Sequence, residues 1–239
     1  MDIIKKQGKL YLIPAKLGDS EYEAIFPNIN KELILSIDTF IIEDLRSARR
    51  FLKSLNYPGN FDNVNFHLLN EHTESEETSH YLDAINEGKD VGILSEAGMP
   101  CIADPGNVIV RMAHRKDIAV IPLTGPSSIF LSLAASGFNG QNFSFLGYIP
   151  IKPNERSNFL KEVEKRVWKL SQTQIFIEAP YRNVKLFESI IQNCGTNTML
   201  CIACDITLNT EFIRTKSIAE WKKVKPDIHK RPTVFLLYK

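Results

Sequence analysis

The sequence predicts an α/β protein made of two α/β domains, the first built on a mostly parallel sheet and the second on a mixed sheet. In the first half of the chain, short apolar runs alternate with longer amphipathic stretches, a pattern typical of buried parallel strands covered by helices. In the second half, only four residues separate Ile206 from Glu211, too few for a crossover helix. The runs on either side are therefore expected to pair antiparallel.

Five apolar runs define the expected strands of the first domain. They are residues 9–14, 39–42, 64–69, 91–95 and 118–123. Helical periodicity between them is clearest over residues 45–55 and 81–87. These elements predict strand–helix–strand units.

A second set of apolar runs defines the sheet of the second domain. They are residues 143–149, 173–179, 199–206, 211–215 and 233–238. A charged stretch of helical period, 153–170, separates the first two. Glycines at both ends of 137–140 punctuate the chain, so we expect domains at residues 1–138 and 139–239.

Composition restricts the class of protein. The 239 residues carry a net charge of +1, so no field of the whole molecule steers it to nucleic acid or membrane. Charges recur through residues 5–9, which argues against a signal peptide, and no apolar stretch is long enough to span a bilayer. We therefore expect a cytoplasmic protein.

The four cysteines do not predict a metal site. Cys201 and Cys204 form a C-x-x-C, but they lie within an apolar run that is expected to be a buried strand. A zinc site would need a second pair of ligands at comparable spacing, and none exists in the sequence. We expect no metal, and buried, reduced thiols.

Ligands of open parallel sheets bind outside the carboxyl ends of the strands, so the loops there are candidate sites. In the first loop, 14–19, Gly18 allows close approach of the backbone and Asp19 is expected to cap a helix. The second, 95–106, carries two prolines, two glycines and two acids, which makes it both rigid and approachable. Each loop has a purely structural alternative, which for the second is a turn with Asp104 as N-cap.

A third loop, 123–128, opens a helix rich in Ala and Ser. Ser127 or Ser128 is expected to cap this helix, and its first N–H groups could hold polar atoms of a ligand. A helix start also occurs without any ligand. Neither G-x-x-x-x-G-K nor G-x-G-x-x-G occurs, which disfavours nucleoside triphosphates and dinucleotides.

Taken together, these loops resemble those of the tetrapyrrole methylase family of S-adenosylmethionine-dependent enzymes. The resemblance rests on SEAGMPCIADPG at 95–106, VIPLTGPSS at 120–128 and IEAPYR at 177–182. It is closest to the branch that methylates a ribose 2′-oxygen of small-subunit ribosomal RNA, whose E-D-T-R motif is matched at 43–46 and whose H-E-H-N-E-like stretch is matched at 70–74. The match runs in order from about Gly8 to the C-terminus.

The resemblance implies a homodimer of two-domain chains with the donor, S-adenosyl-L-methionine, in the cleft between the domains and S-adenosyl-L-homocysteine as product. Carboxylates or carbonyl oxygens of residues 95–106 would suit the hydroxyls and the cationic sulfonium of the donor. The donor contacts carried over are Pro14, Leu17, Gly18, Glu96, Ala97, Gly98, Met99, Pro100, Ile102, Ala103, Ser127, Ser128, Glu178, Ala179, Asp205, Ile206, Thr207, Pro232 and Thr233.

The same resemblance gives candidates for chemistry at the acceptor. A hydroxyl acceptor benefits from a base or a polarising cation, and positioning supplies most of the catalysis. The candidates are Glu43, Asp44, Glu178 and Arg182, with Arg46 as an anchor for phosphate or acceptor. A structural ion pair is the alternative for each.

Departures from the branch leave the acceptor open. Its R-E-L-T-K motif reads Cys-Asp-Ile-Thr-Leu at 204–208, so two cations are missing. Basic clusters occur at 46–53 and 222–231, the latter with five cations against one acid, although solvated surfaces often look alike. No aromatic residues are evidently interleaved with them. Three hypotheses follow: methylation of ribosomal RNA, methylation of a tetrapyrrole or other small molecule, or a non-catalytic binding module.

Overall fold

A computed structural model describes residues 7–58, 60–70, 73 and 77–239. The contacts divide the chain into two compact units, Met1–Pro126 and Ser127–Lys239. The sequence had suggested a division after residue 138. The difference is helix α5 (Ser128–Ser136), which belongs to the second unit because it packs against three strands there.

The first unit contains a five-stranded sheet in the order β3-β2-β4-β1-β5. All its strand pairings are parallel, which confirms the sequence-based expectation. Each strand falls within its predicted apolar run. The strands are β1 (Leu10–Ile13), β2 (Thr39–Ile42), β3 (Asn65–Leu68), β4 (Val91–Leu94) and β5 (Val120–Pro122).

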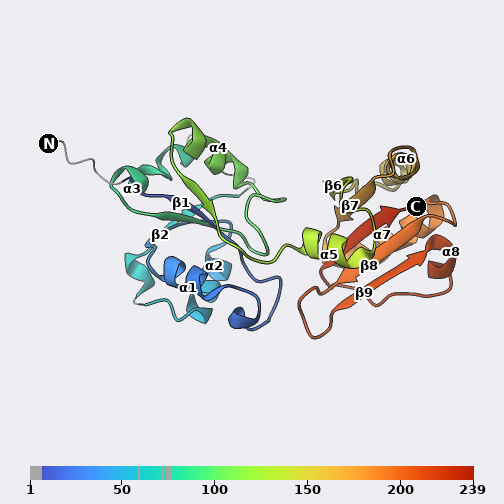
Figure 1. Ribbon diagram of the computed structural model, residues 1–239, viewed down its shortest axis with the longest axis horizontal. Helices are drawn as coiled ribbons and strands as arrows, with labels where there is room; N and C mark the ends of the chain where they lie inside the picture. Colours follow the sequence, from blue (N-terminus) through green and yellow to red (C-terminus); the bar gives the residue numbers. More distant parts are fainter. Residues whose placement is uncertain (1–6, 59, 71–72, 74–76) are drawn as a thin grey trace. The chain divides into compact units, whose positions relative to one another are not determined.

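Helices cover both faces of this sheet (Figure 1). They are α1 (Asn28–Leu35), α2 (Leu45–Ser54), α3 (Asp83–Asn86) and α4 (Asn107–Arg115), with 3-10 turns η1 (Tyr22–Ala24), η2 (Phe61–Asn63) and η3 (Glu77–His80). In β2, Phe40 and Ile42 pack with α1 and α2, whereas Ile41 packs with α3 and α4. This alternation follows from the two-residue period of a strand.

The helix expected over residues 81–87 is shorter than predicted. A 3-10 turn precedes it, and Gly88, at φ +90°, ends it because that backbone conformation cannot continue a right-handed helix.

The second unit is built on a mixed sheet in the order β6-β7-β10-β8-β9. β6 pairs parallel with β7, and the remaining pairs are antiparallel, including the β8–β9 pair predicted from its short connection. The strands are β6 (Phe143–Tyr148), β7 (Thr173–Ile177), β8 (Met199–Cys204), β9 (Phe212–Ser217) and β10 (Thr233–Tyr238).

The sheet of the second unit is likewise covered on both faces. On one face lie α6 (Pro153–Leu170), α7 (Asn183–Asn193) and α8 (Ile218–Trp221), whose apolar side chains form one cluster with alternate strand residues such as Phe176 and Phe235. Helix α5 packs against β8, β9 and β10. The 3-10 turn η4 (Pro180–Arg182) links β7 to α7.

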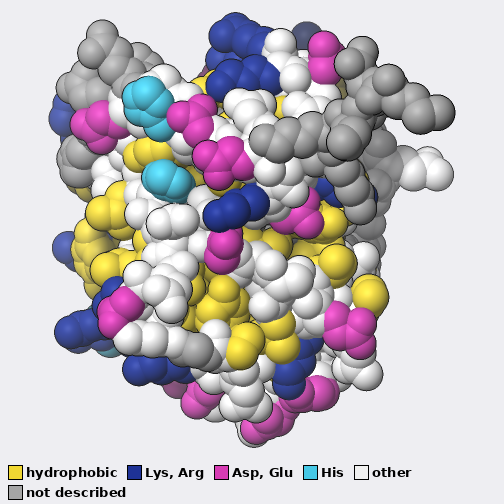
Figure 2. Space-filling view, turned by 90° about the vertical axis from the view of Figure 1, so that its left-hand side faces the viewer, with side chains coloured by type: hydrophobic (Ala, Val, Ile, Leu, Met, Phe, Trp, Pro, Cys, Tyr) yellow, Lys and Arg dark blue, Asp and Glu magenta, His cyan; other side chains and the backbone are white. Residues whose placement is uncertain are grey.

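The distribution of charged side chains on the surface fits the small net charge of the chain. Lys and Arg are interspersed with Asp and Glu on the face shown in Figure 2, as the net charge of +1 suggests. Cys194, Cys201 and Cys204 are buried free thiols, and Cys101 is half-buried. Among the helices that the structure describes, none is both long enough and apolar enough to cross a bilayer.

Candidate active site

Three loops meet at the carboxyl edge of the parallel sheet. Because β4, β1 and β5 are parallel neighbours, the loops that follow them leave the same edge. Ala15 and Gly98 exchange backbone hydrogen bonds of 2.9 and 3.1 Å, which joins the first loop to the second. A Cβ on Gly125 would lie 2.3 Å from Cγ of Pro14, so the third loop packs directly on the first. The convergence expected from the sequence is therefore present within the first unit.

The second loop carries an unusual amount of left-handed backbone. Gly98 has φ +73°, and the non-glycine residues Cys101 and Ala103 have φ +68° and +65°. This conformation costs a non-glycine residue roughly 1–2 kcal/mol, and such strain gathers at functional sites. The loop is thus held in a shape that its residues would not adopt on their own.

Asp104 holds that shape. Its carboxylate accepts hydrogen bonds of 2.8 Å from the backbone N–H groups of Cys101 and Gly106. The alternative in which Asp104 caps the next helix does not hold, because α4 has Gly106 as its N-cap residue and Asp104 folds back on the loop instead. Burial raises the pKa of the Asp104 carboxyl, although these two hydrogen bonds act in the opposite direction.

A pocket of about 530 Å³ opens beside these loops. Its walls come from residues 15–19, from 95–97 and from four side chains on one face of α2. It therefore brings together four of the predicted donor contacts, Leu17, Gly18, Glu96 and Ala97. Of the other contacts predicted in these loops, Pro14, Gly98 and Pro100 are buried, Met99 is half-buried, and Ile102 and Ala103 are exposed.

Asp19 also lines this pocket but caps no helix. The 3-10 turn that follows has Glu21 as its N-cap residue, with no side-chain hydrogen bond. The chain runs on through Ser20 before turning, so the carboxylate of Asp19 lies too early in the sequence to cap.

The E-D-x-R stretch after β2 places its three candidates differently. Glu43 is half-buried and accepts a hydrogen bond of 3.3 Å from the backbone N–H of Glu96, which ties it to the second loop. Burial, with repulsion from Asp104, raises the pKa of the Glu43 carboxyl. Asp44 is exposed and caps α2 by accepting from the N–H of Ser47 at 2.7 Å, which lowers its pKa.

These contacts give Glu43, Asp44 and Arg46 different roles. Arg46 is exposed in the first turn of α2. Asp44 has a structural role at the start of this helix, whereas Glu43 is the candidate that faces the convergent loops.

In the second unit, the IEAPYR stretch forms an ion pair at the end of β7. The side chain of Glu178 is fully buried, and its Oε1 accepts from Nη2 of Arg182 at 2.5 Å and from the N–H of Ala179 at 2.7 Å. Oε2 of Glu178 and Nε of Arg182 are buried without a hydrogen-bond partner among the described residues. Glu178 and Arg182 therefore act as a unit that still has unsatisfied polar atoms.

The segment after β8 is strained in the same way as the second loop. Asp205 has φ +51° and Thr207 has φ +73°, which is a rare conformation for a β-branched residue. The backbone N–H of Thr207 donates to Oε2 of Glu211 at 2.9 Å, while its Oγ1 is buried and finds no partner in the described part of the chain. Ile206 between them is buried.

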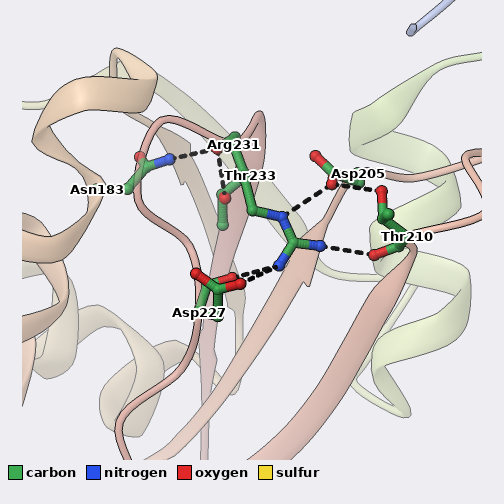
Figure 3. A network of polar contacts seen from close by, with 6 residues as sticks. All are labelled: Asn183, Asp205, Thr210, Asp227, Arg231 and Thr233. Atoms are coloured by element: carbon green, nitrogen blue, oxygen red, sulfur yellow. Dashed lines mark hydrogen bonds and ion pairs between the residues drawn. The ribbon is translucent and has the colours of Figure 1, made fainter. Parts of the chain in front are cut away.

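Arg231 holds this segment in place (Figure 3). Its Nε donates to Oδ2 of Asp205 at 2.8 Å, and its other nitrogens donate to Thr210 and to Asp227. Sequence reasoning had counted Arg231 among the surface cations of 222–231. The structure corrects this, because two carboxylates neutralise its charge and its side chain is only 23% exposed.

Of the remaining predicted contacts, Pro232 and Thr233 adjoin the Arg231 network, whereas Ser127 and Ser128 lie at the start of α5. The carbonyl of Pro232 accepts from the N–H of Asp205 at 2.9 Å, and Oγ1 of Thr233 donates to the carbonyl of Arg231 at 2.9 Å. Ser127 caps α5 as predicted, accepting from the N–H of Phe130 at 3.5 Å, and Ser128 is the first residue of that helix.

Two further predictions from the sequence concern the stretch at 70–74 and metal binding. Residues 71, 72 and 74 of the H-E-H-N-E-like stretch lie outside the described residues. Among the residues with described positions, no three His, Cys, Asp or Glu side chains are grouped so as to hold a metal ion.

Comparison with known proteins now defines the class. A family model described as Tetrapyrrole (Corrin/Porphyrin) Methylases matches residues 31–221. The chain is 32% identical to the Ribosomal RNA small subunit methyltransferase I of Thermotoga maritima over 226 residues, which cover 92% of this chain and 94% of that protein. It is 27% identical to the protein of the same name from Buchnera aphidicola subsp. Schizaphis graminum, over 99% of this chain and 80% of that protein.

A solved structure shares the fold. The crystal structure of the methyltransferase CobJ matches with a TM-score of 0.63 at 14% identity and covers 97% of this chain and 94% of that chain. The family model and the relatives named above identify the protein as a methyltransferase. It belongs to the tetrapyrrole (corrin/porphyrin) methylase family.

Proposed function

We propose that this protein transfers a methyl group from S-adenosyl-L-methionine to a ribose 2′-oxygen of small-subunit ribosomal RNA. The observation that carries the proposal is the identity of 32% to the Thermotoga maritima enzyme, which extends over 94% of that protein. The name of that relative identifies small-subunit ribosomal RNA as its substrate. The ribose 2′-oxygen comes from the resemblance of the motifs described above.

Unsatisfied polar atoms support a donor site of mixed polarity. Oε2 of Glu178 and Oγ1 of Thr207 are buried and lack hydrogen-bond partners within the described chain. Leaving such atoms unpaired costs about 1–3 kcal/mol each, which a polar ligand would recover. In the first unit, Gly98 and Gly125 let the three loops pack closely on one another at the carboxyl edge of the sheet, where ligands of such sheets bind. We propose that these atoms and these loops belong to the donor site.

The chemistry follows from this assignment. When bound, S-adenosyl-L-methionine supplies a methyl group that is already activated on a positively charged sulfur. The protein then has to orient the acceptor hydroxyl, exclude water and take up its proton. Glu43 is our candidate for the base, because it is half-buried, faces the second loop and has a raised pKa. Arg182 and Arg46 are candidates for polarising or anchoring the acceptor.

Nucleoside mass spectrometry tests the acceptor. Small-subunit RNA from a deletion strain is expected to lack one 2′-O-methyl nucleoside, which the intact gene restores and a Glu43→Gln gene restores poorly. An unchanged nucleoside profile in the deletion strain would overturn the RNA proposal. It would favour a tetrapyrrole or another small molecule as the acceptor. Absence of calorimetric donor binding by the purified chain would instead indicate a non-catalytic module.

We further propose a homodimer in the cytoplasm. The support is the family resemblance together with a sequence that favours reduced thiols. Light scattering coupled to size exclusion gives the mass in solution, and a value near the 27.2 kDa of one chain would contradict the dimer.

A further inference from the structure

An exposed tyrosine stands at the mouth of a second pocket, outside the donor residues. This pocket, of about 700 Å³, lies between the start of α7 and residues 225–229. Tyr181 lines it with 60% of its surface exposed. An aromatic side chain this exposed and not packed in a core presents a face on which a planar ligand can stack.

The ring of Tyr181 is held in position. The guanidinium of Arg182 lies 4.8 Å from the ring centroid, and Nη1 of Arg182 donates to the hydroxyl of Tyr181. Arg182 is itself anchored on buried Glu178. The ring is therefore ordered before any ligand arrives, which lowers the entropy cost of stacking.

The pocket wall that includes this ring also carries two lysines. Lys185 and Lys225 line the same pocket, together with His229. Within the described residues, neither lysine forms an ion pair. Of the two acids in the pocket wall, Glu188 and Asp227, the latter is already paired with Arg231. Lys185 and Lys225 thus outnumber the one remaining acid, Glu188, which leaves an excess of positive charge for an anionic partner.

Two hydrogen bonds link the chain segments on either side of the pocket. Nδ2 of Asn183 donates to the carbonyl of Arg231 at 2.7 Å (Figure 3), and the N–H of Lys230 donates to the carbonyl of Pro180 at 3.1 Å. Residues far apart in the sequence thus form one surface, which sequence reasoning missed when it found no aromatic residue among the basic clusters.

We propose that Tyr181, Lys185, Lys225 and His229 form a binding surface for single-stranded RNA, with a base stacked on Tyr181 and the lysines on flanking phosphates. The inference rests on the proposed function and adds to it the place where the RNA is held. An aromatic face beside a basic groove is the combination by which proteins hold unpaired nucleotides. Duplex RNA, whose bases are already stacked, cannot use the tyrosine face.

The experiment measures binding of a fluorescein-labelled single-stranded oligouridine to the full chain by anisotropy over a range of salt concentrations. Tyr181→Leu is expected to weaken binding at least about fivefold, whereas Tyr181→Phe, which keeps the ring, retains most of it. Lys185→Ala combined with Lys225→Ala is expected to flatten the salt dependence by about 1.4 in log–log slope, at about 0.7 per phosphate contact.

Matched controls exist in the same unit. Lys165 and Lys169 on α6 are exposed lysines beside an exposed aromatic, Trp168. Lys165→Ala with Lys169→Ala, and Trp168→Leu, remove the same charge and a similar ring elsewhere. They are expected to leave both affinity and salt slope unchanged.

The outcomes separate this surface from the proposed function. The proposal is overturned if the chain fails to bind the oligouridine, or if the pocket variants and the control variants behave alike. It is equally overturned if Tyr181→Phe loses as much affinity as Tyr181→Leu, or if a duplex of equal length competes as well as the single strand. Selective loss in the pocket variants supports it even if no methyl group reaches ribosomal RNA, and in that case the proposed acceptor alone is wrong.

Discussion

Arg182 donates to Glu178 through a 2.5 Å hydrogen bond that joins the turn η4 to the end of β7. The carboxylate is fully buried, whereas the guanidinium reaches the surface and touches Tyr181. This single contact therefore connects a buried anion in the candidate donor site with an exposed ring in the candidate RNA surface.

Removing the cation should destabilise the protein. Arg182→Ala leaves the carboxylate of Glu178 buried without its charged partner, and we expect unfolding in urea to lose about 3 kcal/mol. Lys165→Ala breaks an exposed ion pair with Glu162 and serves as the control, with no measurable change expected. Equal effects of the two substitutions would contradict the structural role assigned to Glu178 and Arg182.

The contact between the first and third loops should tolerate no side chain at Gly125. In Gly125→Ala the new methyl group would meet Cγ and Cβ of Pro14 at 2.3 and 2.5 Å, so we expect a loss of about 1–3 kcal/mol and weaker donor binding in calorimetry. In Gly140→Ala the methyl group meets nothing within 4 Å, and stability should change by less than about 0.5 kcal/mol. A neutral Gly125→Ala would show that the loops can separate freely.

Replacing the strained Thr207 should raise the stability of the protein and lower its affinity for the donor. Thr207→Gly relieves the left-handed conformation, and after the added chain entropy of glycine we expect a gain of about 0.5–1 kcal/mol. The same variant loses the unpartnered Oγ1, so its donor affinity should fall, whereas Thr207→Ser keeps the hydroxyl and should bind better than Thr207→Gly.

Asn56→Gly is the control for the strain itself. Asn56 has φ +57°, but asparagine tolerates this conformation, so its replacement should gain less stability. Unchanged donor affinity in Thr207→Gly would remove Thr207 from the donor site.

The raised pKa of Glu43 predicts a pH-dependent stability. Burial disfavours the charged form, so the folded protein keeps this proton to a higher pH than the unfolded chain, in which a Glu titrates near 4.5. Stability contributed by the protonated form is therefore lost as pH rises above that value. Glu43→Gln should gain stability relative to the wild type as the pH rises above 4.5, as followed by urea unfolding.

Glu87 on the surface provides the comparison for this experiment. Glu87→Gln should track the wild type throughout the pH range. A difference between Glu43→Gln and the wild type that does not vary with pH would contradict the raised pKa.

Local patterns predicted the secondary structure well where they were strong. In the described part of the chain, each strand overlaps its apolar run, although β9 extends two residues beyond it, and the charged amphipathic stretch became α6 with the expected bounds. Short-range expectations about caps were less successful. Ser127 caps its helix as expected. Asp19 does not cap a helix, and neither does Asp104, whose cap was the structural alternative for its loop, because the backbone after each residue turns in a way that the residue's own identity does not determine.

The candidate site, too, could be predicted from the sequence only in part. The convergence of residues 14–18 with 95–100 could be predicted, since neighbouring parallel strands deliver their loops to one edge. The position of Arg231 could not be predicted, because its partners Asp205 and Thr210 lie more than twenty residues away in the chain. In a run of lysines and arginines, nothing local distinguishes a cation that is paired with carboxylates from one that is exposed.

Periodicity and turn chemistry act over a few neighbouring residues, so the two α/β domains, the parallel and mixed sheets, and the glycine- and proline-rich loops could be predicted from the sequence. The pairing of polar groups could not. Folding pairs Arg182 with buried Glu178, pairs Arg231 with Asp205 and places Tyr181 and Lys225 in the wall of one pocket. Such pairings depend on burial and on contacts between distant segments, and both exist only once the chain has folded.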